Sequence, residues 1–302
     1  IDQNEDELAA EVIKKFNDLR MICKKMPRCG LSAARNAAIK TARGRFCAFP
    51  DDDCYFPDNL LQTLYSRLHA FSIDGLSVQV VDAENNSSAG GVMSRSPWQK
   101  ITKYNVWYCG NSSGLFLKRN ILIQISGFNE QLGIGASGKF QSGEDTEILL
   151  RLIAENYAIY YTAQTTVVHP PVTWRADWRR AFRYGCGGGW VLAHYDYPLP
   201  FALLMLLWKL FLTIRFLAKA DLQLAKFHFF MGIGKISTFV RHYRHPQYLV
   251  FLAALLLSGI VVAATPIPSN DAVGRYAPMA DAFARGNWLY AFHPRFGVYF
   301  SA

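Results

Sequence analysis

The sequence predicts an α/β domain with a largely parallel sheet, followed by helices that associate with a membrane. From residue 1 to about 170, segments with helical spacing of apolar residues alternate with short β-type runs, the pattern of a sheet flanked by helices. Beyond residue 190, long apolar stretches interspersed with basic residues replace this alternation. With 51% hydrophobic and 18% charged residues, the 302-residue chain is too apolar for disorder and too charged for a polytopic bundle throughout.

Each element of the α/β part follows from a local pattern. Residues 6–19 predict a helix. Ser32 has the chemistry of an N-cap for an Ala-rich helix that runs to Ala42 and is broken at Gly44. Residues 45–49 predict a short buried strand that is closed by Pro50. Residues 146–155 predict a helix with one apolar side, and further strands are expected at 76–81, 114–117 and 158–168. Residues 82–103, rich in Asn, Ser and Gly, predict a loop over the site.

The charge and the cysteines limit the class of protein. Of the formal charge of +9, most lies in residues 172–247, which hold eleven Lys and Arg against three Asp. Because apolar runs adjoin these cations, we expect an anionic membrane surface as the partner and no nucleic acid. The six cysteines form no CxxC pair, so we expect reduced, cytosolic thiols and no structural zinc. The chain opens without a basic and apolar leader, so we expect no signal peptide.

Two apolar stretches differ in charge. Residues 248–264 carry no charge and predict a transmembrane helix whose N-terminal side lies in the cytoplasm. Residues 198–217 are similarly apolar but contain Lys209 and Arg215. A second span would put the following basic loop outside, against the positive-inside tendency, so we expect a helix lying in the membrane interface. The alternative is that both stretches are buried core helices.

An acidic cluster, Asp51, Asp52 and Asp53, directly follows the predicted strand that ends at Phe49. Ligands of open α/β sheets bind beyond the carboxyl ends of strands. Three adjacent like charges repel, and a divalent cation relieves that repulsion; oxygen ligands favour Mg²⁺ or Mn²⁺. The alternative is an Asp-rich turn before Pro57.

A second acidic pair, Glu144 and Asp145, follows Gly143 at the start of the predicted helix. A carboxylate at a helix N-terminus is stabilised as the anion and is ready to accept a proton at neutral pH. The alternative is purely structural, because Ser142 and Asp145 have the spacing of a capping box.

Taken in order, these motifs resemble family 2 glycosyltransferases of the GT-A fold. The matching segments are 30–36 (GLSAARN), 42–44 (ARG), the strand 46–49, 51–53 (DDD), 126–130 (SGFNE), 143–145 (GED) and 149–151 (LLR). The resemblance covers about residues 1–190 and implies a Rossmann-like mixed sheet flanked by helices. It also implies inverting transfer of a sugar from a nucleoside-diphosphate sugar to a hydroxyl of a glycan or lipid-linked acceptor, in cell-surface polysaccharide or glycolipid synthesis.

Roles for individual residues follow from this resemblance. Asp51 and Asp53 fill the family's metal positions, with Mg²⁺ or Mn²⁺ as the ion and His169 as a further candidate ligand, and Asp145 is the general base. The donor nucleotide would be contacted by Asp2, Arg35, Asp51 and Asp52. Glu144, Arg179 and Arg183 are expected on the acceptor and membrane side.

The expected organisation is a glycosyltransferase domain at 1–190, basic amphipathic helices at 191–247, a transmembrane helix at 248–265 and an extracytoplasmic segment at 266–302. The family places a nucleotide-binding strand ahead of the position of Asp2, so we expect a domain truncated by its first strand. The tail, with residues 275–280 (RYAPMA) and 286–288 (GNW), is similar to the first extracytoplasmic loop of polytopic glycosyltransferases that use lipid-phosphate sugars. We therefore expect an enzyme of the inner (plasma) membrane with its catalytic domain in the cytoplasm.

The region after residue 170 adds a possible docking helix. Trp174, Trp178 and Phe182 repeat every four residues, and Arg175, Arg179 and Arg183 repeat one position later, so a helix would separate an aromatic face from an arginine stripe. The stripe would lie near lipid phosphates, or alternatively be a merely solvated face. The glycines at 185 and 187–189 suggest a turn that cradles phosphate, though without a P-loop Lys.

Two other function classes are compatible with these residues. A magnesium-dependent nuclease or phosphotransferase would use the same acidic cluster on phosphodiesters. A catalytically inactive fragment would only anchor a partner to the membrane.

Overall fold

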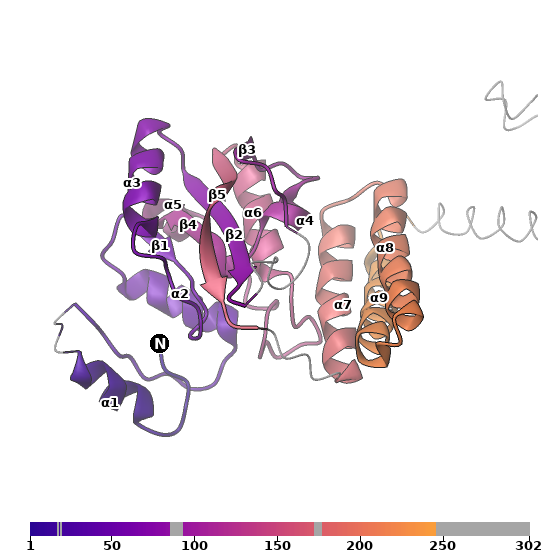
Figure 1. Ribbon diagram of the computed structural model, residues 1–302, viewed down its shortest axis with the longest axis horizontal. Coiled ribbons are helices and arrows are strands. Elements are labelled where there is room, and N and C mark those ends of the chain that lie inside the picture. Colours follow the sequence, from indigo (N-terminus) through magenta and orange to yellow (C-terminus); the bar gives the residue numbers. More distant parts are fainter. Residues whose placement is uncertain (17, 19, 85–92, 172–176, 246–302) are drawn as a thin grey trace, which may run out of the picture. The chain divides into compact units, whose positions relative to one another are not determined.

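The computed structural model describes residues 1–245 except 17, 19, 85–92 and 172–176 (Figure 1). The chain divides into two compact units, Ile1–Arg244 and His245–Ala302, and all elements named below belong to the first. The expected transmembrane helix at 248–265, the segment 266–302, Trp174, Arg175 and the centre of the 82–103 loop lie outside the described residues.

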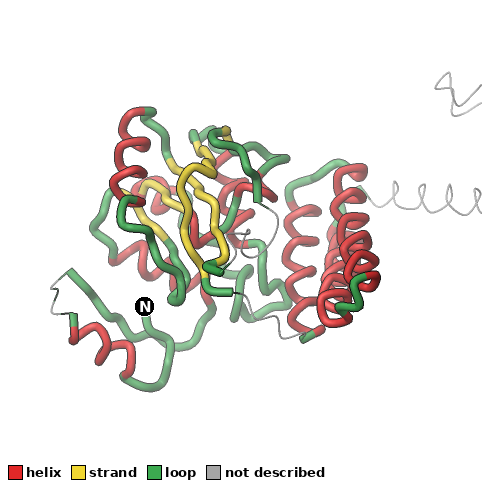
Figure 2. Tube along the Cα trace, viewed as in Figure 1, coloured by secondary structure: helices red, strands yellow, loops and turns green. Residues whose placement is uncertain are grey.

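A five-stranded mixed sheet forms the centre of this unit, in the order β1-β4-β2-β5-β3 (Figure 2). Its strands are β1 (Phe46–Ala48), β2 (Gly75–Asp82), β3 (Gln99–Lys100), β4 (Leu115–Lys118) and β5 (Ile159–His169). The mixed α/β architecture is confirmed, but the expectation of a largely parallel sheet was wrong. Within this sheet β2 and β5 pair in parallel, while the β1–β4, β2–β4 and β3–β5 pairs are antiparallel.

The antiparallel direction of β4 follows from the connection that leads to it from β2. A parallel return to the sheet needs a crossover helix that covers one face. In the described part of the connection from β2 to β4, the helix is α4 (Val106–Cys109), followed by a single 3-10 turn at Ser112–Gly114. A helix of four residues is too short to cover the sheet, and β4 runs antiparallel to β2.

The hydrophobic core is built around β2, whose residues are buried throughout except Gln79. Leu76, Val78 and Val80 have no exposed surface. The flanking helices are α2 (Leu31–Thr41), α3 (Leu60–Ala70), α5 (Arg119–Gln124) and α6 (Glu144–Ala154) (Figure 1). The helix α6 buries Ile148, Leu149 and Leu152, as its apolar spacing predicted.

Two helix boundaries differ from expectation. The first helix, α1, is Leu8–Lys15, shorter than the predicted 6–19. Gly30, not Ser32, is the N-cap of α2, with φ of 91°. A Cβ at Gly30 would lie 2.8 Å from the carbonyl oxygen of Gly135, so both the backbone angle and this close approach favour glycine. The Ser32 hydroxyl instead donates to the carbonyl of Leu132 at 2.7 Å.

Three further helices follow the sheet: α7 (Trp178–His194), α8 (Leu199–Ala218) and α9 (Leu222–His242). The expected glycine turn at 185–189 was wrong, because these residues are buried within α7. Gly185 and Gly189 are one helical turn apart, and a Cβ at either would overlap the backbone of α9. The glycines therefore allow close packing of α7 against α9, as small residues at such spacing do between helices.

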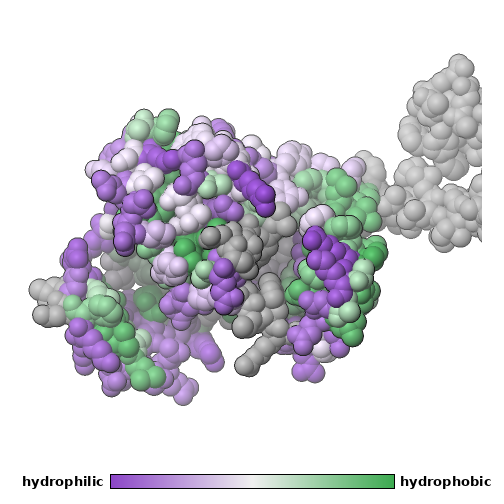
Figure 3. Space-filling view, viewed as in Figure 1, coloured by the Kyte–Doolittle hydropathy of each residue, from purple (hydrophilic) through white to green (hydrophobic). Residues whose placement is uncertain are grey.

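The helix α8 is the one helix among the described residues that is long and apolar enough to cross a membrane, by length and composition alone. Its side chains Leu204, Leu207, Phe211 and Ile214 are each at least half exposed. Figure 3 shows apolar surface gathered over α8 and α9. The expected domain boundary at residue 190 falls inside α7, which is one continuous helix.

Candidate active site

The acidic cluster lies on a turn that is fastened to the end of β5. The Cys54 N–H donates to the Asp51 carbonyl at 3.0 Å, which closes the turn after β1. The next residue, Tyr55, forms an antiparallel bridge with Val168 through two backbone hydrogen bonds of 2.9 and 3.1 Å. This bridge brings the turn beside His169, whose Nε2 lies 3.6 Å from Oδ1 of Asp53.

The second acidic pair begins α6, as predicted, but no capping box forms. The N-cap is Gly143, with φ of 92° and no side-chain cap. The Ser142 hydroxyl donates to the Tyr184 carbonyl at 2.7 Å, and Oδ1 of Asp145 accepts from the Thr146 N–H at 2.8 Å. A Cβ at Gly143 would meet α7 at Val191 and Gly187, so this position is restricted by both packing and backbone.

Arg35 connects the two acidic clusters. Its guanidinium is buried, with Nη2 3.7 Å from Oδ1 of Asp51 and Nη1 3.4 Å from Oε1 of Glu144. Nη2 also donates to the Ser112 hydroxyl at 3.0 Å. Because a single side chain reaches both carboxylates, Arg35 holds the turn after β1 beside the start of α6.

Sequence reasoning missed two serines in this network. The Ser113 hydroxyl donates to Oδ2 of Asp51 at 2.8 Å, and the neighbouring Ser112 binds Arg35. Asn111 orients them, since its side chain caps the 3-10 turn by accepting from the Ser113 N–H at 3.0 Å. The signal was the Asn-Ser-Ser-Gly sequence at 111–114 ahead of a strand, which is a turn motif without any specific chemistry.

The motifs of the two chain halves bind one another. The Asn36 side chain accepts from the Phe128 N–H at 2.7 Å and donates to the Phe128 carbonyl and to Glu130, each at 2.9 Å. Arg151 donates to the carbonyls of Ile125 and Gly127, at 2.7 and 2.6 Å. These contacts hold the turn at 126–130 between α2 and α6, and they explain why polar residues recur in these motifs without lining the cleft.

Burial changes the acidity of the site. It raises the pKa of Glu144, with a further rise from the neighbouring Asp145 charge and an opposing effect of Arg35. Burial also raises the pKa of Asp145. A carboxylate with a raised pKa is a stronger base, and the pair titrates as a coupled unit.

An open cleft of about 670 Å³ lies over the cluster. Its lining includes Arg35, Asp51, Asp52, Asp53 and His169, together with Arg180 from α7. Arg180 was not predicted; its Nη2 donates to the Tyr184 hydroxyl at 2.7 Å.

Five predicted site residues do not line this cleft. Glu144 and Asp145 lie at the start of α6, where Glu144 contacts the cleft residue Arg35. Arg179 and Arg183 are exposed on α7. The Asp2 carboxylate is buried, accepts from the Asn4 N–H at 2.9 Å and lies 3.0 Å from the Lys25 ammonium, while its neighbour Ile1 does line the cleft. The contacts with Asn4 and Lys25 lower the pKa of Asp2.

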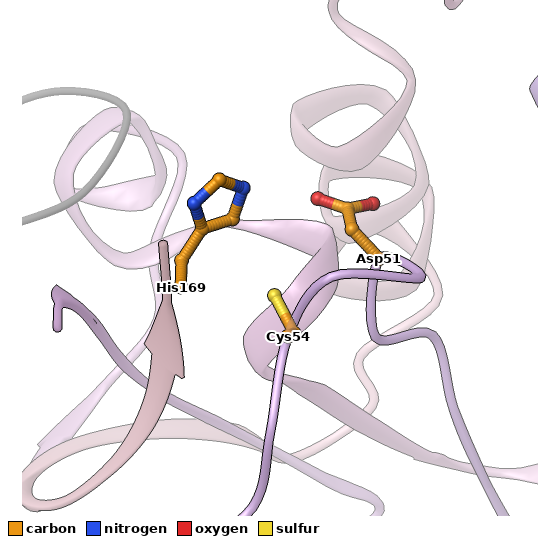
Figure 4. Close-up of side chains that lie close together, drawn as sticks. All are labelled: Asp51, Cys54 and His169. Atoms are coloured by element: carbon orange, nitrogen blue, oxygen red, sulfur yellow. The ribbon is translucent and has the colours of Figure 1, made fainter. Parts of the chain in front are cut away.

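The residues at the turn fit a divalent cation. Ligand atoms of Asp51, Cys54 and His169 all lie within 4.8 Å of one another (Figure 4). Asp51 offers oxygen donors and His169 a nitrogen donor, which Mg²⁺ and Mn²⁺ accept, and Cys54 adds a sulfur atom.

Residues 1–122 match the family model described as Glycosyl transferase family 2. The matched part is 122 of the 302 residues. A segment of 47 residues is 47% identical to the Escherichia coli UDP-Glc:alpha-D-GlcNAc-diphosphoundecaprenol beta-1,3-glucosyltransferase WfaP. That match covers 15% of this chain and only 19% of the length of WfaP.

Solved glycosyltransferase structures are similar to the chain at low identity. Staphylococcus aureus TarS 1–349 in complex with UDP-GlcNAc is 16% identical, with a TM-score of 0.44 over 80% of this chain and 81% of that one. The mannosyltransferase PcManGT from Pyrobaculum calidifontis, in complex with GDP-Man and Mn²⁺, is 17% identical, with a TM-score of 0.45 over 96% of this chain and 72% of that one.

Proposed function

We propose that this protein transfers a sugar from a nucleoside-diphosphate sugar to a hydroxyl acceptor, with inversion at the anomeric carbon. The family 2 match over residues 1–122 supports the glycosyltransferase class. The observation that carries the mechanism is Arg35, which lies 3.7 Å from Asp51 and 3.4 Å from Glu144 and so joins the two acidic clusters. A direct displacement needs one base and one stabilised leaving group on either side of the same sugar, and no covalent nucleophile.

The base in this proposal is Asp145, at the start of α6, which would take the proton from the acceptor hydroxyl as the oxygen attacks. Its raised pKa makes it a better acceptor of that proton than an ordinary aspartate. Glu144, next to it, would lie on the acceptor side and contacts Arg35, which also reaches Asp51.

On the donor side, Asp51, Asp53 and His169 would hold Mg²⁺ or Mn²⁺. When bound, the cation would neutralise charge on the departing diphosphate. Arg35 holds the Asp51 carboxylate in place together with Ser113, and it faces the cleft where the nucleotide would lie. Asp52 lines the same cleft, and Asp2 adjoins it through Ile1; both remain proposed nucleotide contacts.

The acceptor is proposed to be a glycan or a lipid-linked sugar at the inner membrane, with the catalytic domain on the cytoplasmic side. Exposed Arg179 and Arg183 on α7 and the apolar surface of α8 support membrane association. WfaP, similar over its short match, acts by its name on a diphosphoundecaprenol-linked sugar with UDP-glucose.

The test is thermal unfolding of the protein with Mn²⁺ and UDP-, GDP- or dTDP-sugars, followed by transfer assays. A ligand that binds the folded state raises the midpoint, so one donor should do so only with the cation present. Asp145→Asn should lower transfer by at least about 100-fold and retain the donor-induced shift. Asp51→Asn should lose that shift, while the exposed Asp58→Asn should behave as wild type.

Two outcomes would overturn this function. Transfer that survives in Asp145→Asn would show that Asp145 is not the base. Hydrolysis of phosphodiesters, with no thermal shift by any sugar nucleotide, would favour a magnesium-dependent nuclease or phosphotransferase instead.

A further inference from the structure

We propose that Cys54 supplies a thiolate ligand to the cation site of Asp51 and His169, so that this site selects Zn²⁺ or Co²⁺ over Mg²⁺ and Mn²⁺. The proposal rests on the proposed function only for the role of Asp51 and His169 as ligands. It adds a donor that the acidic cluster does not imply, and it changes which ion the site holds most tightly.

The backbone places Cys54 directly opposite His169. Tyr55 and Val168 face each other across an antiparallel bridge, with N–H to carbonyl distances of 2.9 and 3.1 Å in the two directions. In an antiparallel pair, the residue before one member lies across from the residue after the other. Cys54 precedes Tyr55 and His169 follows Val168, so the bridge sets these two side chains together.

The turn brings Asp51 to the same place. The hydrogen bond from the Cys54 N–H to the Asp51 carbonyl folds the chain back, and both side chains lie on the side facing His169 (Figure 4). In Figure 4 the Cys54 sulfur points into the gap between the His169 ring and the Asp51 carboxylate. The Asp51 carboxylate is fixed there by the Ser113 hydroxyl at 2.8 Å.

The distances suit a single small ion. The three donor atoms lie within 4.8 Å of one another. Zinc bonds of about 2.3 Å to sulfur and 2.0–2.1 Å to nitrogen place two ligands of one ion at most about 4.4 Å apart. Binding one ion requires these atoms to move closer together; all three residues are half-buried, and Asp51 and His169 line the open cleft.

The chemistry of sulfur decides the selectivity. Mg²⁺ and Mn²⁺ prefer oxygen donors, whereas thiolate and imidazole favour Zn²⁺ and Co²⁺. On binding, the Cys54 S–H proton leaves to solvent and a sulfur–metal bond forms, with no redox change. Cys54 is available for this because it is a free cysteine.

Cobalt gives a readout that is independent of activity, since thiolate ligation produces a charge-transfer band in the near ultraviolet. The full-length wild-type protein should show this band on titration with Co²⁺ alone. Cys54→Ser should lose the band and bind Co²⁺ and Zn²⁺ at least about tenfold more weakly, with Mn²⁺ affinity changed by less than that. Cys29→Ser, at an exposed cysteine away from the turn, should keep the band.

A second measurement needs no variant. Zn²⁺ should slow the alkylation of Cys54 in the wild-type protein, measured peptide by peptide, while the exposed Cys29 should react at an unchanged rate. Co²⁺ binding without the thiolate band, or alkylation of Cys54 that Zn²⁺ does not slow, would overturn this proposal and leave the metal role of Asp51 intact. Failure of Mn²⁺, Co²⁺ and Zn²⁺ alike to bind would overturn both.

Discussion

Nη1 of Arg35 lies 3.4 Å from Oε1 of Glu144, and both side chains are buried. These residues are 109 positions apart in the sequence, on α2 and α6. Arg35 also lies 3.7 Å from Asp51. Arg35 therefore connects the proposed donor and acceptor sides of one site.

Replacing Arg35 should damage both stability and activity. Arg35→Met leaves Glu144 buried without its cation, which we expect to cost about 3–5 kcal/mol in the free energy of unfolding. Denaturant unfolding measures this change. Arg28→Met, at an exposed arginine, should change it by less than about 0.5 kcal/mol. Equal effects of the two substitutions would show that the buried ion pair contributes nothing.

The pH dependence of transfer should follow the acidic pair at the start of α6. Burial and the adjacent Asp145 raise the pKa of Glu144 to about 7, and Asp145 is raised as well. The base Asp145 must be deprotonated to act, so kcat/KM should fall as the pH is lowered, and at a higher pH than an ordinary aspartate would give. Glu144→Gln removes the neighbouring negative charge and should move this limb to lower pH. If kcat/KM changes at the same pH in Glu144→Gln as in wild type, the charge of Glu144 does not affect the ionisation of the base.

The same shift predicts how stability varies with pH. A raised pKa means that folded Glu144 binds its proton more tightly than unfolded Glu144 does. Its contribution to the free energy of unfolding is therefore full below the ordinary value of 4.5 and is lost as pH rises through about 7. Unfolding of wild type and Glu144→Gln between pH 4 and 8 would measure this, and the difference between them should change over that window. A constant difference would contradict the shift.

The exposed face of α8 should be shielded in membranes. Leu204 on α8 is 64% exposed and Leu61 on α3 is 58% exposed, so cysteines at the two positions should react alike with a water-soluble thiol reagent in the isolated fold. With the full chain in membranes, Leu204→Cys should react much more slowly than Leu61→Cys, because lipid excludes the reagent. Equal labelling rates would place α8 in water.

Packing of α7 on α9 should depend on Gly185. A Cβ there would overlap the backbone of Met231, so Gly185→Ala should destabilise the fold by about 1–3 kcal/mol or more. Gly232→Ala is the matched helical control, because its Cβ would only reach ordinary contact with Lys209 at 3.5 Å. That control should be neutral or stabilise by up to about 1 kcal/mol. Thermal unfolding of both variants tests the difference.

Local patterns were sufficient for much of the fold. Strand β2, with its run of apolar residues, and helix α6, with its apolar side, lie where spacing predicted them. Two predictions that depended on tertiary contacts were wrong. Ser32 has the chemistry of an N-cap but lies two residues beyond the actual N-cap Gly30, which has a positive φ. The glycines of α7 resembled a turn because nothing in their own sequence reveals that α9 packs against them.

The sequence by itself determined which groups are available: two acidic clusters in fixed order, a histidine ending a strand, and the apolar character of α8. Only the tertiary structure decided which of them meet. Arg35 joins Asp51 to Glu144, and the Tyr55–Val168 bridge sets Cys54 against His169. The reason is physical: side-chain periodicity is a property of a few neighbouring residues, whereas these contacts depend on strand order and register across more than a hundred residues.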